Sequence, residues 1–236
     1  MMAVNENMTE LLTKIIKNAI IDGEYQIGDK LLPLRELATK YQVSRSVVNS
    51  AISTLAAQGF VTVTPRHFVV VDDYMTKGPI NILIDVLNSK NQPLKLKLMK
   101  DALEFRKFVE IECVRMVIRG KNENFLAIDE SIRQEQVYLS HPTRDINTLV
   151  ELDLQFHRSI IHETGNSVYK LIHRNFEELA TRMIRFFYQH FEHAEQVFKW
   201  HATIHQAIVA GNEELAVTIL NNVLDQGARY VLNLMK

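Results

Sequence analysis

The sequence predicts a mainly α-helical protein with an N-terminal winged helix-turn-helix (three helices plus a β-hairpin) and a C-terminal all-α antiparallel helical bundle. Three observations predict this fold class. The chain has 236 residues, which is long for one all-helical domain and sufficient for two. Apolar residues recur at the 3.6-residue spacing of amphipathic helices over most of the chain. This spacing changes once, to a β-rich pattern over residues 60–71.

The first 73 residues contain the elements of a winged helix-turn-helix in order. After a loose tail at residues 1–7, helical patterns cover residues 8–21, 33–41 and 45–58. Ser44 is suited to cap the third helix, and Gly59 is suited to end it. The runs 60–64 and 68–71 flank the turn Pro65-Arg66-His67, so they predict the hairpin that forms the wing.

The outer face of the third predicted helix carries short and polar side chains. Arg45 and Asn49 can donate hydrogen bonds to base edges, and the serine hydroxyls of this face can reach phosphates. An ordinary solvated helix face is the alternative interpretation, but the surrounding helix-turn-helix and hairpin favour DNA recognition. Because the net charge is −1, DNA binding must depend on such a local patch.

The stretch from Asp72 to Pro79 is charged and ends in Gly78-Pro79, so we expect a linker at residues 74–79 between a DNA-binding domain at 1–73 and a helical domain at 80–236. In the second domain, helical patterns cover residues 80–89, 94–118, 122–139, 145–164, 168–190, 192–210 and 213–235. Their short connections, which contain glycine or proline, predict antiparallel neighbours.

The cellular location can also be predicted. The one cysteine, Cys113, excludes an internal disulfide and fits a reducing compartment. No apolar run approaches the roughly 20 residues that span a bilayer, and the N-terminus lacks the apolar core of a signal peptide. We therefore expect a cytoplasmic protein without a membrane partner.

The predicted helix at 145–164 carries two ionisable residues on its inner face. Asp153 and His157 lie one turn apart, on the apolar stripe that runs from Leu149 to Ile160. A carboxylate and an imidazole in a core cost free energy unless they are satisfied. Metal coordination, an internal ion pair or a bound ligand would each satisfy them.

His201 lies on the inner face of the helix predicted at 192–210, so it could meet Asp153 and His157 in the core. This donor set suits Zn²⁺, Ni²⁺, Mn²⁺ or Fe²⁺. A hydrogen-bonded core cluster is the alternative. Arg106 also lies on an inner face, with Glu110 one turn later. It is either the partner of Glu110 in a buried pair or an anchor that holds a carboxylate at two points.

Catalytic motifs are not found. His162-Glu163 begins like a zinc-protease box, but position 166 is Asn, so the second histidine is missing. There is no phosphate-binding glycine loop, and Cys113 lies on an apolar stripe, which indicates packing. No catalytic residue is predicted, and we do not expect an enzyme.

Several motifs resemble one family. The segment Val43-Ser44-Arg45-Ser46-Val47-Val48, with Gly59-Phe60-Val61 after it, resembles the winged helix-turn-helix of GntR-type bacterial transcription regulators. The second half resembles the FCD effector domain of the FadR subfamily. The matching pieces there are Glu104-Phe105-Arg106, Asp153-x-x-x-His157, Thr164-Gly165-Asn166 and His201-x-x-Ile204-x-x-Ala207-Ile208-x-x-Gly211-Asn212.

This resemblance implies a homodimer that binds a short palindromic operator in double-stranded DNA. It also implies that the helical domain binds a small carboxylic acid, often through a divalent metal held by one Asp and three His. Asp153, His157 and His201 match three of these ligands, whereas the fourth position is Val223. A water, an effector oxygen or His205 would complete the shell, or the site is metal-free.

The sequence therefore predicts a DNA-binding transcription regulator under the control of a small carboxylic acid. The residues predicted to contact DNA are Arg35 and Ser44 at phosphates, Arg45, Ser46 and Asn49 at base edges, and Arg66 and His67 on the wing. The residues predicted to contact the effector are Arg106, Asn175, Arg182 and His205. Two alternatives stay open: a metal-free regulator that senses another ligand, and a metal-dependent helical enzyme with an accessory DNA-binding module.

Overall fold

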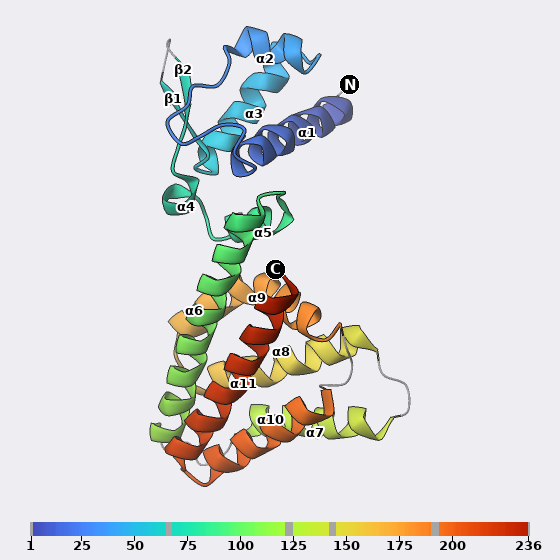
Figure 1. The fold of residues 1–236 in the computed structure, drawn as a ribbon, viewed down its shortest axis with the longest axis vertical. Coiled ribbons are helices and arrows are strands. Elements are labelled where there is room, and N and C mark those ends of the chain that lie inside the picture. The colour runs from blue at the N-terminus through green and yellow to red at the C-terminus, as the bar shows by residue number, and fades with distance from the viewer. Residues whose placement is uncertain (1, 65–67, 121–124, 142–144, 190–193, 236) are drawn as a thin grey trace. The chain divides into compact units, whose positions relative to one another are not determined.

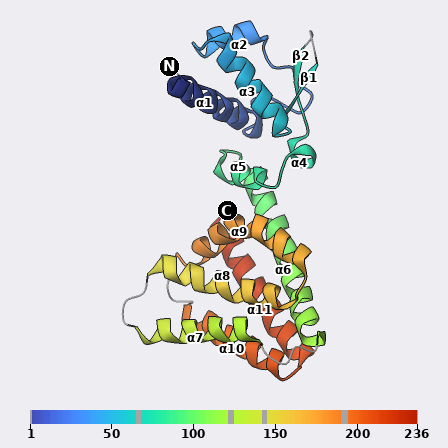
Figure 2. The same ribbon diagram turned by 180° about the vertical axis from the view of Figure 1, so that it is seen from behind.

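A computed structural model of the chain describes residues 2–64, 68–120, 125–141, 145–189 and 194–235. Within these ranges the protein has eleven helices and a single two-stranded hairpin, which confirms the predicted fold class. Figures 1 and 2 show the elements from opposite sides. The chain forms two compact units, one up to Lys95 and the other from Leu96. No helix among the described residues is long and apolar enough to cross a membrane.

The first unit is a winged helix-turn-helix with two short helices after it. Its elements are α1 (Met2–Ile21), α2 (Leu34–Lys40), α3 (Arg45–Ala57), β1 (Val61–Thr64), β2 (Phe68–Val71), α4 (Tyr74–Lys77) and α5 (Ile82–Asn88). The strands are antiparallel, with Val61 opposite Val71 and Thr64 opposite Phe68. The predicted tail at residues 1–7 is wrong from Met2 onward, because α1 begins there. Its first residues include good helix formers such as Met and Ala.

The segment predicted as a linker is packed against the first unit. The ring of Tyr74 in α4 stacks on Phe60 with 5.2 Å between centroids, and Tyr74 is buried. Asp85 in α5 forms an ion pair of 2.8 Å with Lys17 in α1. These long-range contacts extend the first unit to Lys95, beyond the predicted boundary at residue 80.

The second unit is a bundle of six helices among the described residues. They are α6 (Gln92–Arg119), which begins in the first unit, α7 (Leu126–Ser140), α8 (Ile146–Glu163), α9 (Ser167–Phe187), α10 (Ala194–Val209) and α11 (Glu213–Leu234). Helices α6 and α11 are antiparallel, since Lys107 pairs with Asp225 at 2.7 Å and Arg119 pairs with Glu213 at 2.5 Å. Helices α7, α8 and α10 lie across this pair in both views (Figures 1 and 2).

Apolar side chains of five helices form the core of this bundle. The fully or nearly fully buried members are Val109, Cys113, Val114 and Val117 of α6, Ile128 and Ile132 of α7, Phe156, Ile160 and Ile161 of α8, Ile204, Ala207 and Ile208 of α10, and Ala216, Leu220 and Leu224 of α11. Asp145 caps α8 by accepting a hydrogen bond of 2.8 Å from the backbone N–H of Thr148. The capped helix presents Asp153 and His157 beside this core.

We predict that Gly59→Ala destabilises the first unit more than Gly28→Ala does. Both glycines have positive φ, +76° and +92°, so each alanine variant loses about 1–2 kcal/mol through the left-handed backbone. A Cβ at Gly59 would also lie 2.8 Å from the backbone carbon of Lys77, whereas a Cβ at Gly28 meets no atom within 4 Å. Urea denaturation followed by circular dichroism measures both variants. Equal losses would contradict the close approach of α4 to the end of α3.

Candidate functional site

The structure brings together Asp153, His157 and His201, the three metal-ligand candidates. Their side chains are buried, with exposed fractions of 5%, 3% and 0%. Each offers one ligand atom, and these three atoms lie within 4.8 Å of one another. Asp153 and His157 come from α8, because a spacing of four residues places them on one helix face. His201 comes from the buried face of α10.

Two buried carboxylates hold the imidazoles. The Nδ1 atom of His157 lies 2.7 Å from Oε2 of Glu110, and Nδ1 of His201 lies 2.7 Å from Oε1 of Glu135. Both contacts use Nδ1, so they leave Nε2 as the atom that can bind a metal. Such carboxylate–histidine pairs orient metal-ligating imidazoles in proteins. Sequence reasoning missed Glu135, although it lies at helical spacing from Ile132 on the inner face of α7.

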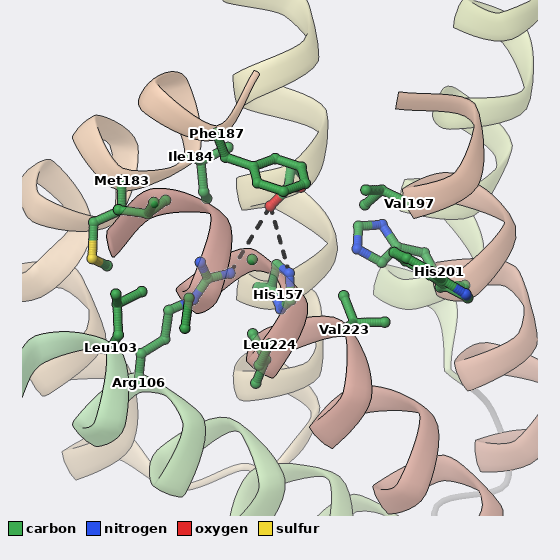
Figure 3. Close-up of a pocket in the computed structure, with 15 residues that line it drawn as sticks. Leu103, Arg106, His157, Met183, Ile184, Phe187, Val197, His201, Val223 and Leu224 are labelled. Atoms are coloured by element: carbon green, nitrogen blue, oxygen red, sulfur yellow. Dashed lines mark ion pairs between the residues drawn. The ribbon is translucent and has the colours of Figure 1, made fainter. Parts of the chain in front are cut away.

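Asp153 has one satisfied oxygen and one open oxygen. The hydroxyl of Tyr188 donates a hydrogen bond of 2.7 Å to Oδ2. Burial, reinforced by the nearby Asp153 carboxylate, raises the pKa of Tyr188 well above its usual value, so this hydroxyl stays a neutral donor. Oδ1 lies 3.5 Å from Nε2 of His157 and 3.9 Å from Nη2 of Arg106, and it accepts no hydrogen bond from the described residues. Figure 3 shows these two contacts as dashed lines.

Arg106 and Glu110 form the buried pair that the sequence suggested, with Nε and Oε1 2.6 Å apart. Burial alone would raise the pKa of Glu110, but the charges of Arg106 and His157 outweigh it and hold this pKa well below its usual range. Burial would likewise lower the pKa of His201, but the Glu135 carboxylate outweighs it and the pKa of His201 is raised. The site therefore holds ionised groups in a core.

Acidic groups outnumber basic ones in this buried cluster. Among the described residues it contains three carboxylates, those of Glu110, Glu135 and Asp153, and one guanidinium, that of Arg106, which pairs with Glu110 and Asp153. Burial raises the pKa of Glu135, and the Glu135 carboxylate raises the pKa of His201, so protons on this pair offset part of the negative charge. Uncompensated buried charge is costly, and a bound cation would offset the remainder.

Arg106, Asp153, His157 and His201 line a cavity of about 50 Å³. Arg106, His157 and His201 point toward it, and Val223 of α11 closes one side (Figure 3). Its wall is otherwise mostly apolar and comprises Leu103, Met183, Ile184, Phe187, Val197, Leu224, Gly227, Ala228 and Val231, together with Trp200. A single water needs roughly 10–15 Å³ of such space, so the cavity has room for an ion with a few small ligands.

A second cavity of about 30 Å³ lies on the other side of two shared residues, Arg106 and Met183. Its remaining wall comprises Phe105, Val109, Glu110, Ile161, Ile172, His173, Phe176 and Ala180. Met183 is therefore the apolar side chain that the two cavities have in common.

Three predicted effector contacts do not line either cavity, so the structure does not support that role for them. The Asn175 side chain is exposed and donates to the carbonyl of Leu171 at 2.8 Å, while Arg182 pairs with Glu178 at 2.9 Å. Helix α9 turns Phe176 and Met183 toward the second cavity instead. Each of them follows a predicted contact by one residue, which is about 100° around the helix. The third, His205, has its Nε2 2.6 Å from Oδ1 of Asp129, so it does not complete the metal shell.

The predicted DNA contacts in the helices lie on the surface of the first unit. Arg45, Ser46 and Asn49 are exposed on α3, and Arg35 is exposed on α2. The opposite face of α3 is buried and comprises Val47, Val48, Ala51, Ile52 and Leu55. Ser44 caps α3 as predicted, because its Oγ accepts a hydrogen bond of 3.3 Å from the backbone N–H of Val47. The wing residues Arg66 and His67 lie outside the described residues.

A winged helix-turn-helix with a free recognition helix, joined to a helical unit with a polar cavity, defines a ligand-responsive DNA-binding protein. Family models agree: residues 9–71 match the model described as bacterial regulatory proteins, gntR family, and residues 101–226 match the FCD domain. The chain therefore belongs to the GntR family of transcription regulators, in the group that carries an FCD domain. Because these proteins are regulators, the enzyme alternative is set aside.

Three curated relatives are named as regulators. The chain is 26% identical to the HTH-type transcriptional regulator LutR of Bacillus subtilis over 89% of this chain and 97% of LutR. It is 24% identical to the fatty acid metabolism regulator protein of Shewanella denitrificans, over 74% of this chain and 70% of the relative. It is 31% identical to the Exu regulon transcriptional regulator of Escherichia coli K12, over 64% of this chain and 55% of that relative.

Solved structures show the same fold. The Listeria monocytogenes protein Lar, described as controlling expression of the agr system, aligns with a TM-score of 0.58 at 18% identity, over 96% of this chain and 97% of Lar. A GntR regulator from Rhodococcus sp. RHA1 aligns with a TM-score of 0.51 at 18% identity, over 95% of this chain and 97% of the Rhodococcus protein.

We predict that Tyr188→Phe destabilises the second unit by about 1–3 kcal/mol, because it leaves a buried carboxylate oxygen of Asp153 without its donor. Urea denaturation followed by the fluorescence of Trp200, the only tryptophan, measures the loss. Tyr169→Phe is the matched control, since that half-buried hydroxyl donates to none of the described residues. Equal stability of the two variants would show that Tyr188 does not support Asp153.

Proposed function

We propose that this regulator binds a divalent metal and a small carboxylic acid in the cavity of the second unit, and that this binding controls its affinity for operator DNA. One observation carries the proposal: Oδ1 of Asp153 and Nε2 of His201 are buried beside the cavity and have no hydrogen-bond partner among the described residues. Buried polar atoms are rarely left unpartnered unless they bind a ligand, a metal or a water.

The donor set fits a metal. Asp153, His157 and His201 offer one carboxylate and two imidazoles, which suit Zn²⁺, Ni²⁺, Mn²⁺ or Fe²⁺. A divalent cation would also offset excess negative charge in the site. When bound, the metal would supply a positive centre that attracts a carboxylate.

Arg106 is the second group that would attract the acid. Its Nε is held by Glu110, so the guanidinium is fixed in orientation, and its side chain lines the cavity. The two Nη groups donate no hydrogen bond to the described residues, so they have hydrogens free for a carboxylate. A fixed guanidinium loses little entropy when it binds such a group.

In the first unit, α3 would enter the major groove with Arg45, Ser46 and Asn49 at base edges. Arg35 and Ser44 would contact phosphates, and the wing would reach the adjacent backbone. A homodimer would present two such helices to a palindromic operator in the cytoplasm. Functionally, we retain residues 1–73 as the DNA-binding domain and residues 80–236 as the effector domain.

We predict that Arg45→Ala weakens operator binding by about 1–3 kcal/mol, because it removes a base-edge donor. An operator is first selected from randomised duplex DNA with the full-length protein, and affinity is then measured at one fixed salt concentration. Arg174→Ala, which removes an exposed arginine of α9, is the control and retains affinity. Unchanged binding by the Arg45 variant would mean that α3 is not the recognition helix.

We predict that Asp153→Asn abolishes metal binding at the cavity while the protein stays folded. The amide has nearly the same shape as the carboxylate and still accepts from Tyr188, but it lacks the charge that holds a cation. Quenching of Trp200 fluorescence by Ni²⁺ measures binding, because this residue lines the cavity. Asp129→Asn, in the surface pair with His205, is the control and binds Ni²⁺ like the wild type.

A further inference from the structure

We propose that Val223 makes metal binding at this site depend on the acid, so that the two ligands are held together and each is held weakly alone. The inference rests on the proposed function, and it concerns how this chain differs from a site with four protein ligands. Three protein atoms would hold the metal, and an oxygen of the acid would supply a further donor.

Few atoms that face the cavity can donate to a metal. Among the described residues that line it, only Asp153, His157 and His201 carry side-chain oxygen or nitrogen atoms that can ligate a divalent metal, and the thioether of Met183 is a soft donor that suits Cu(I) rather than Mn²⁺. The other polar lining groups are the Arg106 guanidinium and the Trp200 indole, which are hydrogen-bond donors only.

The nearby carboxylates and hydroxyl are already engaged. Glu110 and Glu135 contact the Nδ1 atoms of the two imidazoles, so moving either one to the metal would release the histidine that it orients. The Tyr188 hydroxyl donates its hydrogen bond to Oδ2 of Asp153, so it is engaged as well. The described part of the chain therefore offers three oxygen or nitrogen donors to the cavity and no fourth.

Val223 occupies a position on the cavity wall without offering a donor atom. Its side chain lies on α11, on the cavity wall between His157 and His201 in Figure 3. An isopropyl group has no lone pair, so α11 contributes only apolar surface here, together with Leu224, Ala228 and Val231. Two imidazoles and one carboxylate form a set that leaves coordination positions open for exogenous ligands.

The positive charge of Arg106 lies beside the site. The Nη2 atom of Arg106 lies 3.9 Å from Oδ1 of Asp153, the same oxygen that would bind the metal. A metal in the cavity would therefore be close to a buried positive charge, and the two cations repel each other in a medium of low dielectric constant. A carboxylate between them is attracted by both, so it removes this repulsion and fills an open coordination position.

Thermodynamic linkage relates the effect of the acid on metal affinity to the effect of the metal on acid affinity. If the acid tightens metal binding by some factor, the metal must tighten acid binding by the same factor. Couplings between ligands in proteins are commonly about 5- to 150-fold. A fourth protein donor at position 223 would hold the metal without the acid, so it would weaken this dependence.

The experiment compares the full-length wild type with Val223→His and with the control Val209→His, which adds a histidine at an exposed position of α10. Mn²⁺ affinity is measured by equilibrium dialysis, first in acid-free buffer, then with excess acetate and then with excess 2-hydroxypropanoate. We expect at least one of these acids to tighten Mn²⁺ binding by the wild type and by Val209→His about 5- to 150-fold. We expect Val223→His to bind Mn²⁺ tightly in acid-free buffer and to respond less to either acid.

A second variant and a second readout keep the test decisive. Val223→Asp places an oxygen donor at the same position if the imidazole does not fit, and circular dichroism checks that each variant is folded. Adding Asp153→Asn to Val223→His must abolish Mn²⁺ binding, which places the ion in this cavity. Quenching of Trp200 fluorescence by Mn²⁺ reports the same event without any DNA-binding assay.

The failures can be told apart. Equal Mn²⁺ affinity of the wild type and of both position-223 variants in acid-free buffer overturns the inference and leaves the proposed metal site intact. A wild-type affinity that neither acid changes also overturns it. If no protein binds Mn²⁺ under any condition, the inference fails together with the metal part of the proposed function.

Discussion

The carboxylate of Asp153, buried in an apolar helical core, is the constraint on which the second unit depends. Its free-energy cost is offset by groups from two other helices: Tyr188 at the end of α9 donates to one oxygen, and Arg106 of α6 lies near the other. A parallel contact joins α7 to α10 through Glu135 and His201. These polar contacts have strict distance requirements, so they fix how the helices are set against one another more precisely than apolar packing does.

The sequence predicted the parts of this arrangement that depend on helical periodicity. Asp153, His157 and His201 lie on apolar stripes, and their burial follows from spacing alone. Glu135 was missed because an acidic residue on a helix is usually solvated, and its partner is 66 residues away. Asn175 and Arg182 were misplaced because one residue is about 100° of rotation on a helix, so a small error in the inner face of α9 turns them to the surface. The packing of Tyr74 on Phe60 is also a tertiary contact that local composition does not reveal.

The comparisons separate what the fold determines from what the site determines. The chain shares its domain pair with regulators that are named for different metabolic systems, at identities near 25%. The winged helix and the bundle are therefore a common framework, and this framework alone does not decide which ligand is bound. In this chain the cavity of the bundle combines a compact ionic cluster with a wall of aliphatic groups.

Met183 stands between the two cavities of the bundle, and this gives the site an adjustable depth. Its side chain is unbranched and has three rotatable bonds, so it changes shape at little energetic cost. Rotation away from Arg106 would join the ionic cavity to the apolar one lined by Phe105 and Phe176, without moving any helix. The partition between the ionic and the apolar cavity therefore includes a flexible side chain and is not a rigid wall.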